Sequence, residues 1–121
     1  MKQGTIIRAY KALNKLAAEP LPIKTACAVH RLRVAMRPTW EFQQEEEQKE
    51  INRLKPKIEQ NGDLLFQSPE DAQVFRDKLK ELEENEVELS ADVVKMPMLP
   101  EITISADDVD ALEGFVEFTE G

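Results

Sequence analysis

The sequence predicts an α+β fold that is mainly helical, in a single domain spanning residues 1–121. Apolar residues recur at helical spacing over residues 6–17, 23–36 and 72–82, and prolines interrupt the chain between the first two segments. Short apolar segments suited to strands follow Gly62. We therefore expect residues 1–60 to form a helical hairpin with a long second helix. Residues 61–121 are expected to form an acidic α/β portion with a small β element, a C-terminal helix and an extended C-terminal segment.

The first helix is indicated by an apolar stripe at positions i, i+4, i+7 and i+11, formed by Ile6, Tyr10, Leu13 and Ala17. The segment Glu-Pro-Leu-Pro at 19–22 ends this helix, because proline lacks an N–H group and pushes the preceding residue out of the α region. So short a connection predicts an antiparallel hairpin. In that hairpin Ile6, Tyr10 and Leu13 face three side chains of the second helix, which are Val29, Leu32 and Met36.

The second helix changes character along its length. Residues 23–36 are apolar on nearly every side, so the first helix alone cannot cover them. Pro38 is expected to bend or break the helix, and residues 43–50, which contain no large apolar residue, are expected to be solvated. Pro56 either kinks the last turns or restarts them, and Asn61-Gly62 is expected to close the helix C-terminus.

Strands and two further helices are predicted in the C-terminal half. Residues 64–66 and 87–89 are strand candidates that could pair, and 102–104 is another possible strand. Residues 96–100, with two prolines, are expected to form an extended linker. Ser68 followed by Pro69 indicates the start of a helix with the stripe Ala72, Phe75, Leu79 and Leu82. Ser105 is expected to cap a short helix that ends at Gly114.

Charge is divided unevenly along the chain. Residues 1–40 contain eight basic residues and one acidic residue, a net charge of +7, whereas residues 41–121 have a net charge of −15. Opposite fields of this kind steer association. They favour pairing within the molecule or between subunits, and the sequence leaves these alternatives open.

The potential catalytic and metal-binding groups are few. Cys27 and His30 are three apart, a spacing that could support a thiolate–imidazole dyad or a metal. Packing is the better interpretation, because both lie in an apolar run and zinc would require two more ligands. Asp107, Asp108 and Asp110 are interpreted as helix N-terminal residues and not as a cation site. No cofactor, metal or catalytic residue is predicted.

Candidate interaction residues cluster around Pro38: Arg31, Arg33, Arg37, Trp40 and Phe42. The arginines could contact phosphates, but their spacing spreads them over more than one helix face, so nucleic-acid binding is disfavoured and pairing with the acidic half is favoured. The two aromatic residues are either a lid on the core or an exposed contact. No apolar run approaches the roughly 18 residues of a membrane span, so no membrane partner is expected.

Several short motifs occur in a familiar order: Leu13-Asn14-Lys15-Leu16, Pro20-Leu21-Pro22, Asn61-Gly62-Asp63, Leu79-Lys80-Glu81-Leu82 and Glu86-Val87-Glu88-Leu89. With the long helix between them, the chain resembles a family of small uncharacterised proteins encoded by tailed bacteriophages and prophages, often near tail and lysis genes. The resemblance covers most of the chain and implies a phage setting. It brings no active site.

The expected function is therefore that of a non-catalytic, phage-encoded structural or assembly-interaction protein that self-associates. Its expected partners are further copies of itself, other phage proteins or a host protein. The alternative is an acidic inhibitor of a host defence protein that mimics nucleic acid. The single cysteine and the lack of a secretion signal favour the host cell cytoplasm, with incorporation in the virion as a further possibility.

Overall fold

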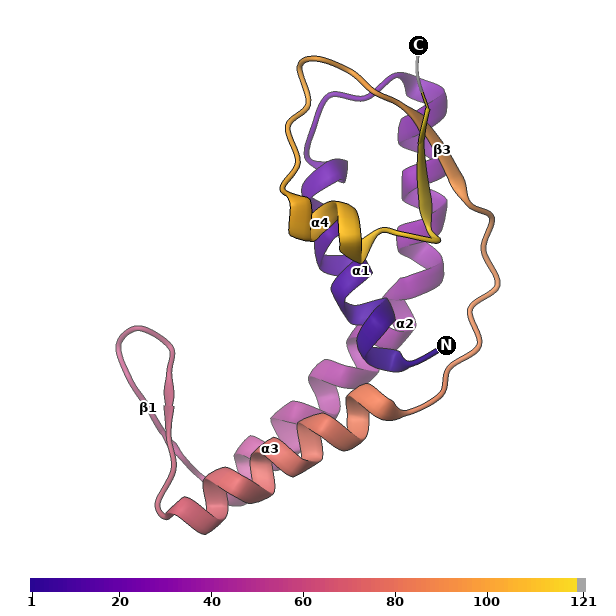
Figure 1. The fold of residues 1–121 in the computed structure, drawn as a ribbon. Helices are drawn as coiled ribbons and strands as arrows, with labels where there is room; N and C mark the ends of the chain where they lie inside the picture. The colour runs from indigo at the N-terminus through magenta and orange to yellow at the C-terminus, as the bar shows by residue number, and fades with distance from the viewer. Residues whose placement is uncertain (120–121) are drawn as a thin grey trace.

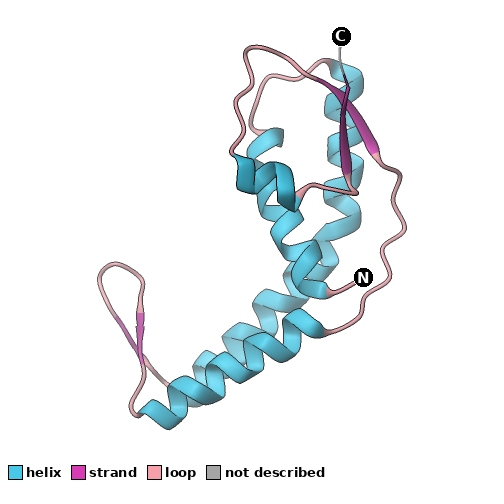
Figure 2. Cartoon of the chain, viewed as in Figure 1, coloured by secondary structure: helices cyan, strands magenta, loops and turns pink. Residues whose placement is uncertain are grey.

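The computed structural model describes residues 1–119, and its fold is α+β and mainly helical, as predicted (Figures 1 and 2). The elements of this part of the chain are, in order, α1 (Gln3–Ala17), α2 (Ile23–Leu54), β1 (Lys57–Ile58), β2 (Leu64–Leu65), α3 (Pro69–Glu84), β3 (Val94–Pro97), α4 (Ala106–Ala111) and β4 (Val116–Thr119). Strands β1 and β2 form an antiparallel hairpin, and β3 and β4 form a parallel pair.

The core lies where α1 packs against the first half of α2. The predicted hairpin contact is confirmed, because Ile6, Leu13, Val29, Leu32 and Met36 all belong to one buried cluster. The remaining side of this cluster is covered by the C-terminal part of the chain, which contributes Val94, Met96, Leu112, Phe115 and Val116. The C-terminal half therefore covers a second side of α2.

Helix α2 continues through Pro38, so the helix is bent and not broken. Figure 1 shows its axis changing direction in the middle. A proline inside a helix removes one backbone hydrogen bond and its ring crowds the preceding turn, which favours a bend. Met36 and Gln43 are buried on either side of Pro38. Packing on both sides holds the helix together across the proline.

The predicted end of α2 at Asn61-Gly62 is wrong. The helix ends at Leu54, and Lys55 takes the left-handed conformation with φ of 50°. Pro56 causes this early end, because the residue before a proline is driven out of the α region. Gly62, with φ of 89°, instead lies between β1 and β2, where the N–H of Gly62 donates to the carbonyl oxygen of Glu59 at 2.9 Å.

Helix α3 starts as predicted and lies along the second half of α2 (Figure 1). Ser68 Oγ accepts a hydrogen bond from the N–H of Asp71 at 3.1 Å, and Pro69 occupies the first turn. This packing corrects in part the expectation that residues 43–50 are solvated, because α3 covers one face of this segment and the other face is exposed. Gln43 is 3% exposed and Glu46 is half-buried, whereas Glu45 on the outer side is exposed.

Glu46 links the two helices and provides a pH-dependent prediction. Its carboxylate accepts a hydrogen bond from Lys49 at 3.2 Å and lies 3.5 Å from Lys78 Nζ of α3. The hydrogen bond from Lys49, helped by the charges of both lysines, lowers the pKa of Glu46. A lowered pKa means that the carboxylate contributes stability above its unfolded-state pKa, and that this contribution is lost as the pH falls through the folded-state pKa.

We therefore expect Glu46→Gln to lower the melting temperature slightly at pH 7. The difference from the unmodified chain should disappear as the pH falls below the folded-state pKa of Glu46. Calorimetry over a pH series measures this difference in melting temperature. The matched control is Glu45→Gln, because Glu45 is exposed. An equal effect of the two substitutions at pH 7 would contradict the α2–α3 link.

The predicted pairing of 87–89 with 64–66 is wrong, because β2 pairs with β1. The segment after α3 instead lies beside the start of the chain, where the N–H of Val87 donates to the carbonyl oxygen of Met1 at 2.7 Å. The linker predicted at 96–100 is also partly wrong. Its first residues belong to β3, which buries Val94 and Met96 and pairs in parallel with β4.

The remaining C-terminal predictions are partly confirmed. Residues 102–104 form no strand, although Ile102 and Ile104 pack against the core. Ser105 caps α4 as predicted, accepting a hydrogen bond from the N–H of Asp108 at 3.1 Å. Helix α4 ends at Ala111, before the predicted end at Gly114, and Gly114, with φ of 86°, lies in the turn between α4 and β4. Helix α4 lies between β3 and β4 in sequence, so it forms part of the crossover connection that two parallel strands require.

Candidate interaction surface

One side of α2 remains uncovered between the side that contacts α1 and the side that contacts β3. Ile23, Cys27, His30 and Val34 define this outer line, and all four are exposed. Ile23 is 84% exposed and Val34 is 45% exposed. Their 4-3-4 spacing places them on one helix face, opposite the buried Val29, Leu32 and Met36 face.

The outer line corrects the interpretation of Cys27 and His30 as packed residues. Both side chains face solvent because the apolar run around α2 is covered on two sides only. Within residues 1–119, no group of three or more His, Cys, Asp and Glu side chains is arranged to hold a metal ion. These two residues thus contribute to an exposed surface.

The three predicted arginines do not form one site. Arg33 is half-buried, and its Nε donates to Asn14 Oδ1 of α1 at 2.9 Å, so it joins the two arms of the hairpin. Arg31 and Arg37 are exposed. None of the ion pairs found among residues 1–119 includes these arginines, so the structure does not show the expected pairing with the acidic half.

The two aromatic candidates have different environments, so each matches one of the two alternatives. Trp40 is part of the lid on the core, because its ring lies 5.3 Å from the ring of Tyr10. Lys11 Nζ lies 5.7 Å from the centroid of the Trp40 ring, within the range of a cation–π contact. Phe42 is 44% exposed and is available for an external contact.

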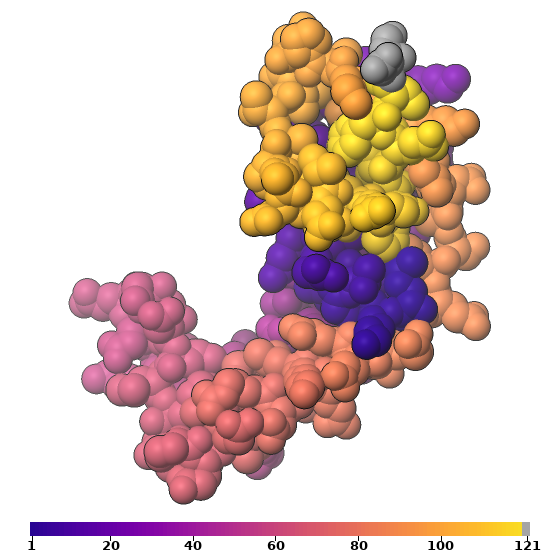
Figure 3. Space-filling model, viewed as in Figure 1, coloured from indigo at the N-terminus to yellow at the C-terminus, as the bar shows by residue number. Residues whose placement is uncertain are grey.

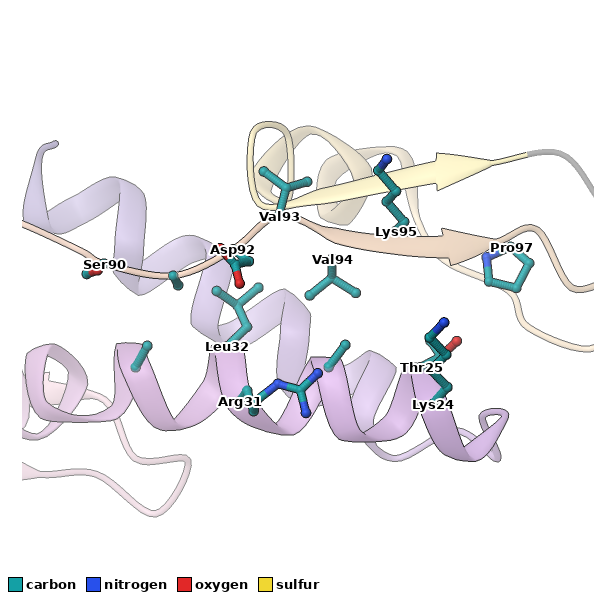
Figure 4. A pocket seen from close by; sticks show the side chains of 13 residues that line it. Lys24, Thr25, Arg31, Leu32, Ser90, Asp92, Val93, Val94, Lys95 and Pro97 are labelled. Carbon is teal, nitrogen blue, oxygen red and sulfur yellow. The ribbon is translucent and has the colours of Figure 1, made fainter.

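A groove of about 660 Å³ runs between α2 and the segment 90–97 (Figure 4). Val94 points from β3 toward α2, and Lys95 points away from it. The groove includes Lys24 and Arg31 on the α2 side and Asp92 on the opposite side. Lys95 also belongs to the lining, so Asp92 offsets only one of three cations and the groove carries an excess of positive charge.

A second, smaller hollow of about 380 Å³ lies between α4 and β4, which share one face of the molecule in Figure 3. We call it the α4–β4 pocket. It is lined by Ala106, Val109, Asp110, Glu113, Val116 and Phe118. It therefore combines apolar side chains with two carboxylates. Sequence reasoning missed it because the C-terminal segment is expected only to be extended, although Val116 and Phe118 alternate with polar residues as a strand requires.

Packing brings the two oppositely charged parts of the chain together. Residues 1–40 have a net charge of +7, and residues 86–119, with nine acidic residues and one basic residue, have a net charge of −8. Both segments contribute to the same core, and Lys15 of α1 lies 3.2 Å from Asp108 of α4. The acidic Asp108 therefore serves a contact between helices in addition to its place in the first turn of α4.

No helix within residues 1–119 is both long enough and apolar enough to cross a membrane. Comparison of the chain with protein-family models, with curated proteins and with solved structures gives no match.

Proposed function

We propose that this protein is a non-catalytic interaction protein that associates with further copies of itself. The observation that carries the proposal is the outer line of α2, where Ile23 and Val34 remain exposed although both belong to the apolar segment 23–36. Burying such a side chain contributes about 1.5–3 kcal/mol. A second protein surface would supply that burial.

Charge supports a protein partner of acidic character. The outer line is flanked by the exposed cations Lys24, Arg31 and Arg37, and it ends near the acidic second half of α2. The chain as a whole has a net charge of −8, so another copy offers acidic surface to this basic face. Opposite charges across an interface accelerate and orient association.

The resemblance to small proteins of tailed phages supports a structural or assembly role for this self-association. The alternative, an acidic inhibitor that mimics nucleic acid, has less support from the distribution of charge. The exposed face of α3 interleaves Asp77 and Glu81 with Arg76 and Lys80. A nucleic acid presents an unbroken row of negative charges, which this helix does not reproduce.

Light scattering on purified protein over a range of concentrations tests the proposal. We expect an apparent mass above the 13.8 kDa of one chain, rising with protein concentration. The mass should decrease as salt rises from low ionic strength, because salt screens exposed charge pairs. A mass of one chain at every concentration and salt level would refute the proposed function.

A further inference from the structure

We infer that the contact between copies is head-to-tail: Ile23 and Lys24 of one copy insert into the α4–β4 pocket of the next. This inference rests on the proposed self-association and names the two surfaces involved. It commits to a second copy as the occupant of the pocket. The reasons are the shape and the charge of the two surfaces.

The inserting group lies at the first turn of α2. Ile23 is the most exposed of the large apolar side chains within residues 1–119, at 84%. It follows Pro22, whose fixed φ restricts the backbone just before the helix. A restrained backbone lowers the entropy cost of placing this side chain in a partner. Lys24, its neighbour, is exposed and positively charged.

The receiving group is the α4–β4 pocket. Val109, 42% exposed, and Phe118 provide apolar walls, and the lining also includes the buried Val116. Asp110 and Glu113 are exposed carboxylates in the lining. An aliphatic side chain accompanied by a cation matches this combination, because the apolar part is removed from water while the ammonium group stays near the carboxylates.

The two surfaces belong to different parts of the molecule, so the contact is not self-complementary. A heterologous contact of this kind leaves one free inserting group and one free pocket at the ends of every assembly that has not closed into a ring. It therefore produces rings or open chains, whereas a two-fold contact stops at a dimer. Self-association should accordingly extend beyond two copies as concentration rises.

Two single variants test the geometry. Ile23→Glu removes the inserting group and keeps the pocket, whereas Val109→Glu obstructs the pocket and keeps the inserting group. Both positions are exposed, so the melting temperature should remain close to that of the unmodified chain. Val109→Ser provides a second pocket variant that adds no charge to α4. The control is Ile58→Glu, because Ile58 is 65% exposed on β1, away from both surfaces.

Each variant alone should be a single chain of 13.8 kDa under conditions in which the unmodified chain and Ile58→Glu form assemblies larger than a dimer. The apparent dissociation constant should rise about 10- to 100-fold, as expected for loss of one buried aliphatic side chain. An equimolar mixture of Ile23→Glu and Val109→Glu should form a heterodimer and nothing larger, because only one intact contact is possible. Native mass spectrometry with one variant isotopically labelled identifies it.

Assemblies that persist in Ile23→Glu and in both Val109 variants would overturn the inference and leave the proposed function standing. A mixture that stays monomeric when each variant alone is monomeric would also overturn it, in favour of a two-fold contact. An unmodified chain that is monomeric throughout would refute both the inference and the proposed function.

Discussion

Replacing Leu32 with alanine should lower the free energy of unfolding by about 2–5 kcal/mol, the usual cost of removing a large buried aliphatic group. Leu32 is 3% exposed and belongs to the cluster in which α1, α2 and the C-terminal part of the chain meet. Because elements from both halves of the chain surround it, the cavity has little freedom to collapse. For a chain of this length, the melting temperature should decrease by about 4 °C for each kcal/mol.

The matched control for Leu32→Ala is Ile23→Ala in the same helix. Both substitutions shorten an aliphatic side chain of the same size, but Ile23 is 84% exposed in one copy. Measured by chemical denaturation at a protein concentration low enough to keep the chain monomeric, Ile23→Ala should cost less than about 0.5 kcal/mol. Equal costs for the two would mean that the buried and exposed faces of α2 have been assigned wrongly.

Local sequence patterns predicted those helices whose periodicity or capping residues lie close together in the sequence. The stripe of α1 and the Ser68-Pro69 start of α3 were both recognisable, since helical periodicity and capping depend on neighbours in sequence. The same applies to Ser105 of α4. These signals also predicted which residues of α1 and α2 contact each other.

The failures involve long-range contacts and competition between local signals. Asn61-Gly62 is a strong turn signal, but Pro56 ends α2 earlier in the chain. Asn61-Gly62 therefore lies in the connection between β1 and β2. Strand β3 was missed because Pro97 and Pro100 suggest a linker. Proline is tolerated at the edge of a sheet, and β3 pairs on one side only, with β4, which lies far away in sequence.

The candidate interaction surface was only partly predictable for the same reason. An apolar pattern on all sides of residues 23–36 indicated that more than α1 must cover α2, but not which side would stay open. Cys27 was therefore placed in the core although it is exposed. The α4–β4 pocket depends on a parallel pairing that no local pattern reveals.

The hydrogen-bonded side-chain amides of Gln3 and Gln43 form a buried contact that the polar composition of residues 43–50 gives no reason to expect. Gln43 lies in a polar stretch, yet its side chain is 3% exposed because α1 and α3 both approach it. Gln3 Nε2 of α1 donates to Gln43 Oε1 at 2.6 Å, and Gln43 Nε2 donates to Glu47 at 2.9 Å. Gln3 Oε1 in turn accepts from Asn85 at 3.2 Å, so the network joins the three long helices at one point.

Gln43→Ala should therefore destabilise the protein by about 1–3 kcal/mol, because the buried amide of Gln3 loses its acceptor and cannot reach water. Gln44→Ala, one residue away on the exposed side, is the control and should change little. Replacing both Gln3 and Gln43 with leucine should cost less than either single leucine substitution, since neither buried amide is then left without the other. Denaturant titration of the unmodified chain, Gln3→Leu, Gln43→Leu and the double variant gives the coupling energy between positions 3 and 43. Additive costs for the two single changes would show that the amides are not paired in solution, and the junction of α1, α2 and α3 would then depend on apolar packing alone.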